Sequence, residues 1–167
     1  MTDMLVRLYA LPDRHAAIAA ALAQGVTVRR PEAWERTTLV AWIGASFSPG
    51  WASECELAFA ARPVSCFIAV ERQTIVGFAC HDCTRPNFFG PAGVVPGRRG
   101  HGIGAALTLA ALGAMHDAGY AYAIIGGTGP EAFYARVAGA VPIAGSTPGI
   151  YDFSLIQRTA PPQSGPI

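Results

Sequence analysis

The chain is organised around one stretch, Val94-Val95-Pro96-Gly97-Arg98-Arg99-Gly100-His101-Gly102-Ile103-Gly104-Ala105-Ala106-Leu107. An apolar strand ends at Pro96, a loop with two arginines and alternating glycines follows, and an apolar helix over 105–118 then begins. The start of a helix exposes unpaired N–H groups and the positive end of the helix dipole. Glycines allow that backbone to approach a ligand closely, and arginines add positive charge. The stretch therefore predicts a binding site for a phosphate-bearing ligand.

The composition of the whole chain is that of a folded protein. Of its 167 residues, 51% are hydrophobic and 14% are charged, which provides enough apolar surface for a core. We expect one domain over residues 1–157 and a flexible tail over 158–167, which contains three prolines. The net charge of +1 gives no electrostatic reason to expect a nucleic-acid partner.

Two features predict a cytoplasmic protein without a membrane partner. The N-terminus lacks a positively charged region followed by an apolar run and a cleavage site, as a secretory signal requires. The most apolar helix, over about 104–115, is too short to span a bilayer and is followed by His116 and Asp117.

The four cysteines, Cys55, Cys66, Cys80 and Cys83, favour buried reduced thiols. Cys80 and Cys83 have C-x-x-C spacing, but a closed zinc site needs a second pair or a spaced histidine pair, and Cys55 and Cys66 do not form one. On a strand, the side chains of Cys80 and Cys83 are expected to face opposite sides. No helix start follows them, as a thioredoxin-type motif requires. We therefore expect no metal ion.

The apolar periodicity predicts helices early in the chain, then an antiparallel meander, then alternating strands and helices. Arg72-Gln73 is the expected turn of a hairpin. Gly90-Pro91 interrupts the strand over 88–95, which indicates an edge, a bulge or a local splay there. The predicted fold class is α/β, a mixed and mostly antiparallel sheet flanked by helices. The predicted strands are 4–9, 65–71, 74–80, 88–95, 120–126, 141–144 and 150–156, with a further extended segment over 26–29; the predicted helices are 13–24, 34–47, 51–61, 105–118 and 131–137.

Two common phosphate-binding motifs do not fit the glycine loop. A P-loop needs a lysine after its glycines, and none is present. Gly100 to Ala105 matches the G-x-G-x-x-A dinucleotide pattern, but residues 96–99 separate the glycines from the strand. The strand over 120–126 also lacks the acidic residue that holds a ribose hydroxyl.

Arg99-Gly100-His101-Gly102-Ile103-Gly104 matches the R-x-x-G-x-G signature of the GNAT (GCN5-related N-acetyltransferase) family. The chain resembles that family from about Ile68 to Ile156, including the Val-Val-Pro strand end before the arginine and Phe133-Tyr134 after it. The resemblance implies a GNAT-like acyl-CoA N-acyltransferase fold with a sheet that splays at the CoA site.

By the same resemblance, the bound co-substrate is acetyl-CoA. The backbone N–H groups from Arg99 to Gly104 are expected to hold its pyrophosphate, and Val94 and Val95 are expected to bind the pantetheine as an extra strand. His101 is expected to be a surface residue of the loop. The expected CoA-binding residues are Val94, Val95, Arg99, Gly100, His101, Gly102, Ile103, Gly104 and Ala105.

The implied reaction is direct acetyl transfer from the thioester to a primary amine in a ternary complex. The N–H of Val95 is the expected donor to the thioester carbonyl. Tyr134 occupies the position where similar GNAT proteins place a tyrosine beside the sulfur, so it is the expected acid or hydrogen-bond donor to the leaving thiolate.

The general base is less well marked, because the strand over 88–95 lacks the glutamate that many GNAT enzymes carry there. Asp82 is the preferred catalytic candidate, ahead of Glu54 and His81, because it ends the neighbouring strand. A water chain or bulk deprotonation is the alternative. The missing carboxylate also leaves open a non-catalytic acyl-CoA-binding sensor or interaction module.

The acceptor is expected to be an amine of a small molecule or a peptide. Aromatic walls and the acidic residues Glu54 and Glu56 are candidates for its pocket, with core packing and a solvated helix face as the alternatives. The connection 145–151 borders either the acceptor or a contact between two copies of the chain, so a homodimer is one expected assembly. The candidate aromatic walls are Trp34, Trp42, Phe47, Trp51, Phe88 and Phe89.

Overall fold

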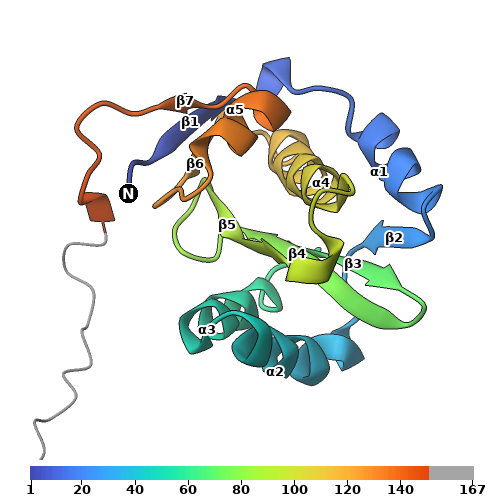
Figure 1. Cartoon of the computed structure of the whole chain (residues 1–167). Helices are drawn as coiled ribbons and strands as arrows, with labels where there is room; N and C mark the ends of the chain where they lie inside the picture. Colours follow the sequence, from blue (N-terminus) through green and yellow to red (C-terminus); the bar gives the residue numbers. More distant parts are fainter. Residues whose placement is uncertain (151–167) are drawn as a thin grey trace, which may run out of the picture.

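A seven-stranded sheet in the order β2-β3-β4-β5-β6-β1-β7 forms the centre of the computed structural model, which describes residues 1–150 (Figure 1). Neighbouring strands are antiparallel except β5 and β6, which are parallel. The predicted mixed, mostly antiparallel sheet is therefore confirmed. The strands are β1 (Met4–Arg7), β2 (Val26–Arg29), β3 (Cys66–Glu71), β4 (Thr74–His81), β5 (Phe88–Val94), β6 (Tyr122–Ile125) and β7 (Val141–Pro142).

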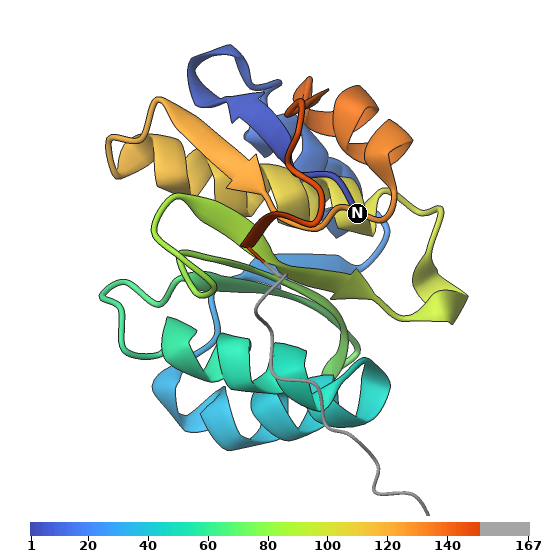
Figure 2. The ribbon, with the colours of Figure 1, turned by 90° about the vertical axis from the view of Figure 1, so that its left-hand side faces the viewer.

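Helices cover both faces of the sheet, as Figure 2 shows. The pair α2 and α3 lies on one face, and α1 and α4 lie on the other. This arrangement confirms the predicted α/β class. The helices are α1 (Arg14–Leu22), α2 (Arg36–Ser46), α3 (Pro49–Ala58), α4 (Ile103–Asp117) and α5 (Glu131–Ala138); short 3-10 turns occupy Leu8–Ala10, Ala33–Glu35 and Pro96–Arg98.

Local signals explain where several elements begin and turn. The Asp13 carboxylate accepts a hydrogen bond from the N–H of His15 at 2.8 Å and so caps α1. Ser48 caps α3 in the same way, with Pro49 as the first helical residue. Arg72 and Gln73 both have positive φ, as the two-residue turn that joins β3 to β4 requires.

The core has two layers, one on each face of the sheet. Apolar residues of α4 fill the first layer, and ten residues of this helix are buried, which explains why its sequence is apolar on nearly all sides. Aromatic side chains of α2 and α3 fill the second layer around Phe78. Phe47 packs so closely on β5 that a Cβ on Gly93 would lie 2.6 Å from its Cε1 atom. The absence of a side chain at Gly93 therefore allows the ring of Phe47, at the end of α2, to pack directly on β5.

The N-terminal strand has a place that the sequence did not predict. β1 lies between β6 and β7, and its Met4 is paired with both Ile125 and Pro142. The Asp3 carboxylate also accepts a hydrogen bond from the N–H of Gly127 at 2.8 Å. The first residues of the chain therefore connect β6 to β7 at one end of the sheet, although both strands lie far from them in the sequence.

Several predicted boundaries were too generous. The predicted strand 4–9 ends at Arg7 because a 3-10 turn follows it. The predicted helix 51–61 ends at Ala58, and it begins earlier than predicted, at Pro49. The predicted strand 141–144 contains only Val141 and Pro142. Ile150 is not part of a strand, and the rest of the predicted strand 150–156, like the predicted tail 158–167, lies outside the described residues.

Among residues 1–150, no helix has the length and apolar character needed to cross a membrane.

Candidate functional site

The glycine loop leads directly into α4. Gly100 and Gly102 have φ of +80° and +77°, a conformation that costs an L-residue with a Cβ roughly 1–2 kcal/mol. Gly102 is the residue before the first helical residue, and with no side chain it cannot cap the helix. Gly104 has another role, because a Cβ there would lie 3.4 Å from the ring of Phe133 on α5. The spacing of the glycines thus serves both the turn and the packing.

The N-terminus of α4 offers unpaired backbone donors. The first N–H of the helix with a partner in the preceding turn is that of Ala106, which donates to the carbonyl of Gly102 at 3.0 Å. The N–H groups of Ile103, Gly104 and Ala105 therefore have no acceptor within the helix. No acidic residue lies in the first turn to compete for them. This combination of free donors and a positive dipole end favours an anion.

The two arginines of the loop differ in their surroundings. Arg98 forms an ion pair with Glu71 on the β3–β4 hairpin, with 2.9 Å between Nη2 and Oε1. Arg99 is exposed, and its Nε donates to the carbonyl of Val94 at 3.0 Å. His101 is also exposed and directs its Nδ1 at the carbonyl of Arg99. Arg99 is therefore the arginine of the loop that lies beside both the strand end and the helix start.

β5 has an open edge beyond its first two residues. Phe88 and Phe89 pair with Ile124 and Ile125 of β6, and Gly90 then adopts a φ of +124° while Pro91 has no N–H to donate. No strand residue of β6 pairs with β5 after this point. Of the edge, bulge or local splay predicted at Gly90-Pro91, the structure has the splay.

Alternation along β5 decides which of its groups face that open edge. The N–H of Val95 donates to the carbonyl of Val76 on the β4 side at 3.0 Å. Because successive residues of an antiparallel pair alternate between facing the partner and facing away, Val94 and Ala92 direct their N–H and C=O groups to the open edge. The expectation that Val95 donates to a thioester carbonyl is therefore wrong, since its N–H is already bonded to β4.

Tyr134 lies in α5 and packs against the start of the splay. Its ring centroid is 5.9 Å from that of Phe89 on β5 and 5.0 Å from that of Phe133. Phe133 in turn contacts Gly104 at the start of α4. Burial raises the pKa of Tyr134 to about 12, so the phenol keeps its proton throughout the physiological range. Tyr134 is thus close to the splay and to the glycine loop.

The structure puts Asp82 at the other end of β5. The N–H of Asp82 donates to the carbonyl of Phe88, so Val94 lies about six extended residues, or roughly 20 Å, further along the strand. Both carboxylate oxygens already accept hydrogen bonds, Oδ2 from Nδ1 of His81 at 2.8 Å and Oδ1 from the N–H of Asn87 at 2.7 Å. Asp82 therefore holds the turn between β4 and β5, and its role as a base stays a prediction.

The residues considered for an acceptor pocket do not all come together, although three of the aromatic residues form one cluster. Glu54 accepts a hydrogen bond from the hydroxyl of Thr84 at 2.7 Å, and Glu56 forms an ion pair with Arg36. Trp34 is 80% exposed, whereas the other candidate aromatic residues are buried or half-buried. Trp42, Phe47 and Trp51 pack on Phe78 in the core.

The cysteines come together in a way that the sequence analysis did not expect. The Sγ atoms of Cys55, Cys66 and Cys80 lie within 4.8 Å of one another, because Cys66 and Cys80 are cross-strand partners and α3 packs over them. β4 ends at His81 and Asp82 has positive φ, so Cys83 turns back to the same layer instead of facing the opposite side. All four are buried free thiols, as predicted, and burial raises the pKa of Cys66 and Cys80 well above the usual range.

Comparison with solved structures finds similar folds in proteins of low sequence identity. A GCN5-related glucosamine N-acetyltransferase region of a fungal multi-domain GH3 β-N-acetylglucosaminidase matches 85% of this chain with a TM-score of 0.69 and 16% identity. A GCN5-related N-acetyltransferase from Sphaerobacter thermophilus matches 85% with a TM-score of 0.64 and 21% identity. A Drosophila protein matches 85% with a TM-score of 0.60 and 16% identity.

The matched region is only part of each of these proteins. This chain spans 19% of the fungal protein, 48% of the Sphaerobacter protein and 47% of the Drosophila protein. No protein-family model matches the chain, and a search of curated proteins finds no match either. The topology, the splayed strand pair and the glycine loop before α4 give this chain the fold of the GCN5-related N-acetyltransferases.

Proposed function

We propose that this protein is a GNAT-family N-acetyltransferase, which transfers an acetyl group from acetyl-CoA to a primary amine of a small molecule or a peptide. The observation that carries the proposal is the position of two unpaired surfaces in direct succession. The open edge of β5 ends at Val94, and the uncapped N-terminus of α4 begins at Ile103. CoA has an amide-containing arm and a pyrophosphate, which match a strand edge and a helix N-terminus in that order.

Each part of the CoA molecule has a proposed partner. The pantetheine amides pair with the outward N–H and C=O groups of Val94 and Ala92, as a further strand would. The pyrophosphate accepts hydrogen bonds from the N–H groups of Ile103, Gly104 and Ala105 and from the backbone of Gly100 to Gly102. The Arg99 guanidinium adds its charge, and to do so it exchanges its bond with the Val94 carbonyl for one with a phosphate.

The transfer step requires a bond change at the thioester. The neutral amine attacks the carbonyl carbon, the C–S bond breaks, and the amine loses a proton to water while the thiolate leaves. An outward N–H of β5, that of Ala92 or Val94, donates to the carbonyl oxygen as it becomes negative. An amine of pKa near 10 is about 0.1% neutral at pH 7, which is sufficient for a slow reaction without a dedicated base.

Tyr134 acts as a hydrogen-bond donor to the leaving thiolate. Its pKa of about 12 exceeds that of a thiol, about 8.5, so complete proton transfer to sulfur would be uphill by about 5 kcal/mol. A hydrogen bond stabilises the developing charge without that transfer. The thiolate takes its proton from solvent after it leaves.

The rival hypothesis is a non-catalytic acyl-CoA-binding sensor or interaction module. The observation that favours it is the lack of any carboxylate on β5, whose residues are Phe-Phe-Gly-Pro-Ala-Gly-Val. Both hypotheses require the same CoA site, and they differ in turnover.

Calorimetry with acetyl-CoA and with CoA tests the shared site, and micromolar affinity is the expected result. An assay of thiol release against a panel of amines then separates the enzyme from the binding module. If neither CoA species binds to the folded protein, both hypotheses are wrong. If both bind and no amine increases thiol release, the binding module is favoured.

Replacing Tyr134 with Phe tests the proposed hydrogen bond. Turnover is expected to fall about tenfold or more, because one hydrogen bond to a charged group is lost, while the affinity for CoA stays the same. Phe keeps the ring contacts with Phe89 and Phe133. Unchanged turnover would remove Tyr134 from the mechanism.

A further inference from the structure

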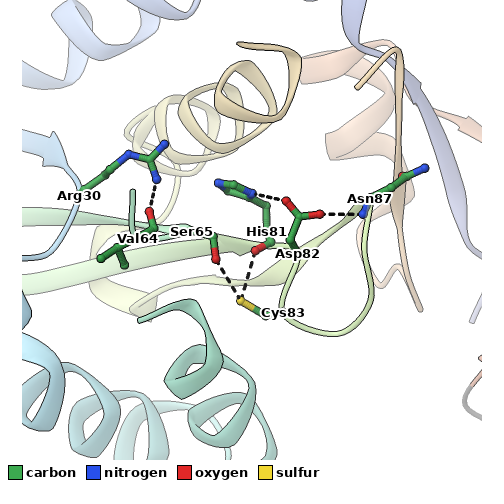
Figure 3. Close-up of polar contacts among 7 residues, drawn as sticks. All are labelled: Arg30, Val64, Ser65, His81, Asp82, Cys83 and Asn87. Carbon is green, nitrogen blue, oxygen red and sulfur yellow. Dashed lines mark hydrogen bonds and ion pairs between the residues drawn. The ribbon is translucent and has the colours of Figure 1, made fainter. Parts of the chain in front are cut away.

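A cavity of about 470 Å³ lies at the C-terminal end of α4, the opposite end from the glycine loop. Its wall includes Ala114 and Ala118 of the helix end, Arg30 after β2, and His81 and Asp82 at the end of β4. Figure 3 shows Arg30 and His81 on two sides of the space beside the helix. None of these groups takes part in the proposed CoA site.

His81 presents a buried nitrogen without a partner. The side chain is 8% exposed, and its Nδ1 lies 2.8 Å from Oδ2 of Asp82. Because a carboxylate only accepts, Nδ1 carries the proton in this pair, which leaves the lone pair on Nε2. Among residues 1–150, nothing hydrogen-bonds Nε2. Burial lowers the pKa of His81, so the neutral ring offers an acceptor at neutral pH.

Asp82 fixes this orientation of the imidazole ring. Its second oxygen accepts the N–H of Asn87 at 2.7 Å, so the carboxylate is held from both sides (Figure 3). An imidazole whose Nδ1 is held in this way cannot rotate to satisfy Nε2 elsewhere without losing a bond. A buried acceptor left unpaired is costly, so Nε2 is expected to meet a donor from outside the chain.

Arg30 provides the opposite kind of group. One of its Nη atoms donates to the carbonyl of Val64, and its guanidinium lies 4.4 Å from the centroid of the Phe67 ring. These contacts fix the planar group, and its other N–H groups bond to no other residue within 1–150. The charge of Arg30 contributes, after burial, to the lowered pKa of His81, which is consistent with the two groups facing a common space.

We propose that this cavity binds a small molecule that carries a carboxylate next to an ammonium or hydroxyl group. The carboxylate accepts from the guanidinium of Arg30, and the ammonium or hydroxyl donates to Nε2 of His81. The end of α4 supports this orientation, because the negative end of a helix dipole favours a cation or donor. A volume of about 470 Å³ is within the range of small-molecule sites.

The test is calorimetry on the full chain without CoA, with three matched probes. L-Alanine carries a carboxylate and an ammonium, lactate carries a carboxylate and a hydroxyl, and propionate carries a carboxylate alone. Alanine, lactate or both are expected to bind, and propionate at least about tenfold more weakly, since it lacks the donor for Nε2. The stronger of the first two identifies the class as amino acid or hydroxy acid. The proposal is overturned if all three probes bind equally well, or if none of them binds.

Variants assign the binding to this cavity. Arg30→Gln is expected to lower the affinity for the more tightly bound of alanine and lactate by at least about tenfold, because a charged hydrogen bond is lost. Arg36→Gln is the control, since Arg36 lies on α2 and pairs with Glu56 away from the cavity. Equal affinity in the Arg30 variant and the control overturns the proposal, provided that both variants melt cooperatively.

A second measurement uses the unmodified protein, because Arg30→Gln removes a bond to Val64 and the variant can be unstable. The ¹⁵N signal of His81 Nε2 reports whether this nitrogen accepts a hydrogen bond. A shift of that signal on addition of the bound probe is expected. A signal that does not change while the probe binds places the probe elsewhere and overturns the proposal.

Discussion

Helices α1 and α4 pack against each other, yet their N-termini are built in opposite ways. α1 begins after Asp13, whose carboxylate occupies the N–H of His15. α4 begins after Gly102, which has no side chain and a φ of +77°. The first helix has one of its N-terminal donors satisfied by a side chain of its own chain, whereas no side chain caps the second. A missing N-cap therefore indicates a binding site for an anion when glycines precede the helix and its first turn has no acidic residue.

The largest effect is expected when the free N-terminus is given a carboxylate of its own. Ala105 is the third residue of α4, and Ala105→Glu puts a negative charge where we propose that the pyrophosphate binds. The affinity for CoA is expected to fall about 100-fold, because charged hydrogen bonds are lost and the two anions repel each other. Calorimetry with CoA measures the change.

The matched control is Ala16→Glu, since Ala16 is the third residue of α1. It introduces the same charge at the same position of a helix that we assign no ligand. CoA affinity is expected to stay the same in this variant. If the two variants bind CoA equally well, the α4 N-terminus does not hold the pyrophosphate.

A smaller effect is expected when the conformation of the loop is strained. Gly102→Ala adds a Cβ at positive φ and is expected to lower the free energy of unfolding by about 1–2 kcal/mol. Gly97→Ala is the control, because Gly97 has ordinary φ and a Cβ there meets nothing within 4 Å. Urea unfolding measures both. Equal stability of the two variants would show that the positive φ of Gly102 is not the reason for a glycine at this position.

The smallest effect is expected at the capped helix. Asp13→Ala removes the acceptor for the N–H of His15 and is expected to lower the free energy of unfolding by about 1 kcal/mol. Asp13→Asn keeps an oxygen at that place and is expected to lose less. CoA affinity is expected to be unchanged in both, and a loss of affinity would mean that α1 supports the CoA site through its packing on α4.

Short-range features of the fold were predicted well from the sequence. Asp13 marks a helix start by its own chemistry, and Arg72-Gln73 forms the hairpin turn between two apolar strands. An interruption of the strand at Gly90-Pro91, as an edge, a bulge or a splay, was also predicted, since proline has no N–H to pair. These features depend on a few neighbouring residues, so a local pattern is enough to find them.

Features that depend on distant parts of the chain were missed or wrong. The expectation for Val95 failed because a strand residue faces its partner or the open edge according to the register with β4, which only pairing determines. The cysteines looked unrelated in sequence, and they meet because α3 packs on the β3–β4 pair. Arg30 belongs to no sequence motif, and only the folded structure brings it to the same cavity as His81.

The uncapped N-terminus of α4 follows from the sequence alone. Glycines at 100 and 102, the lack of an acid in the first turn, and the apolar helix that follows are local properties, and they predict an anion site wherever the segment lies. The tertiary structure decided what stands beside that site. Sheet register turned Val94 rather than Val95 to the open edge, packing of α5 brought Tyr134 there, and the length of β5 kept Asp82 away. The chemistry of each side chain follows from the sequence, whereas the distance between two side chains depends on how the strands pair.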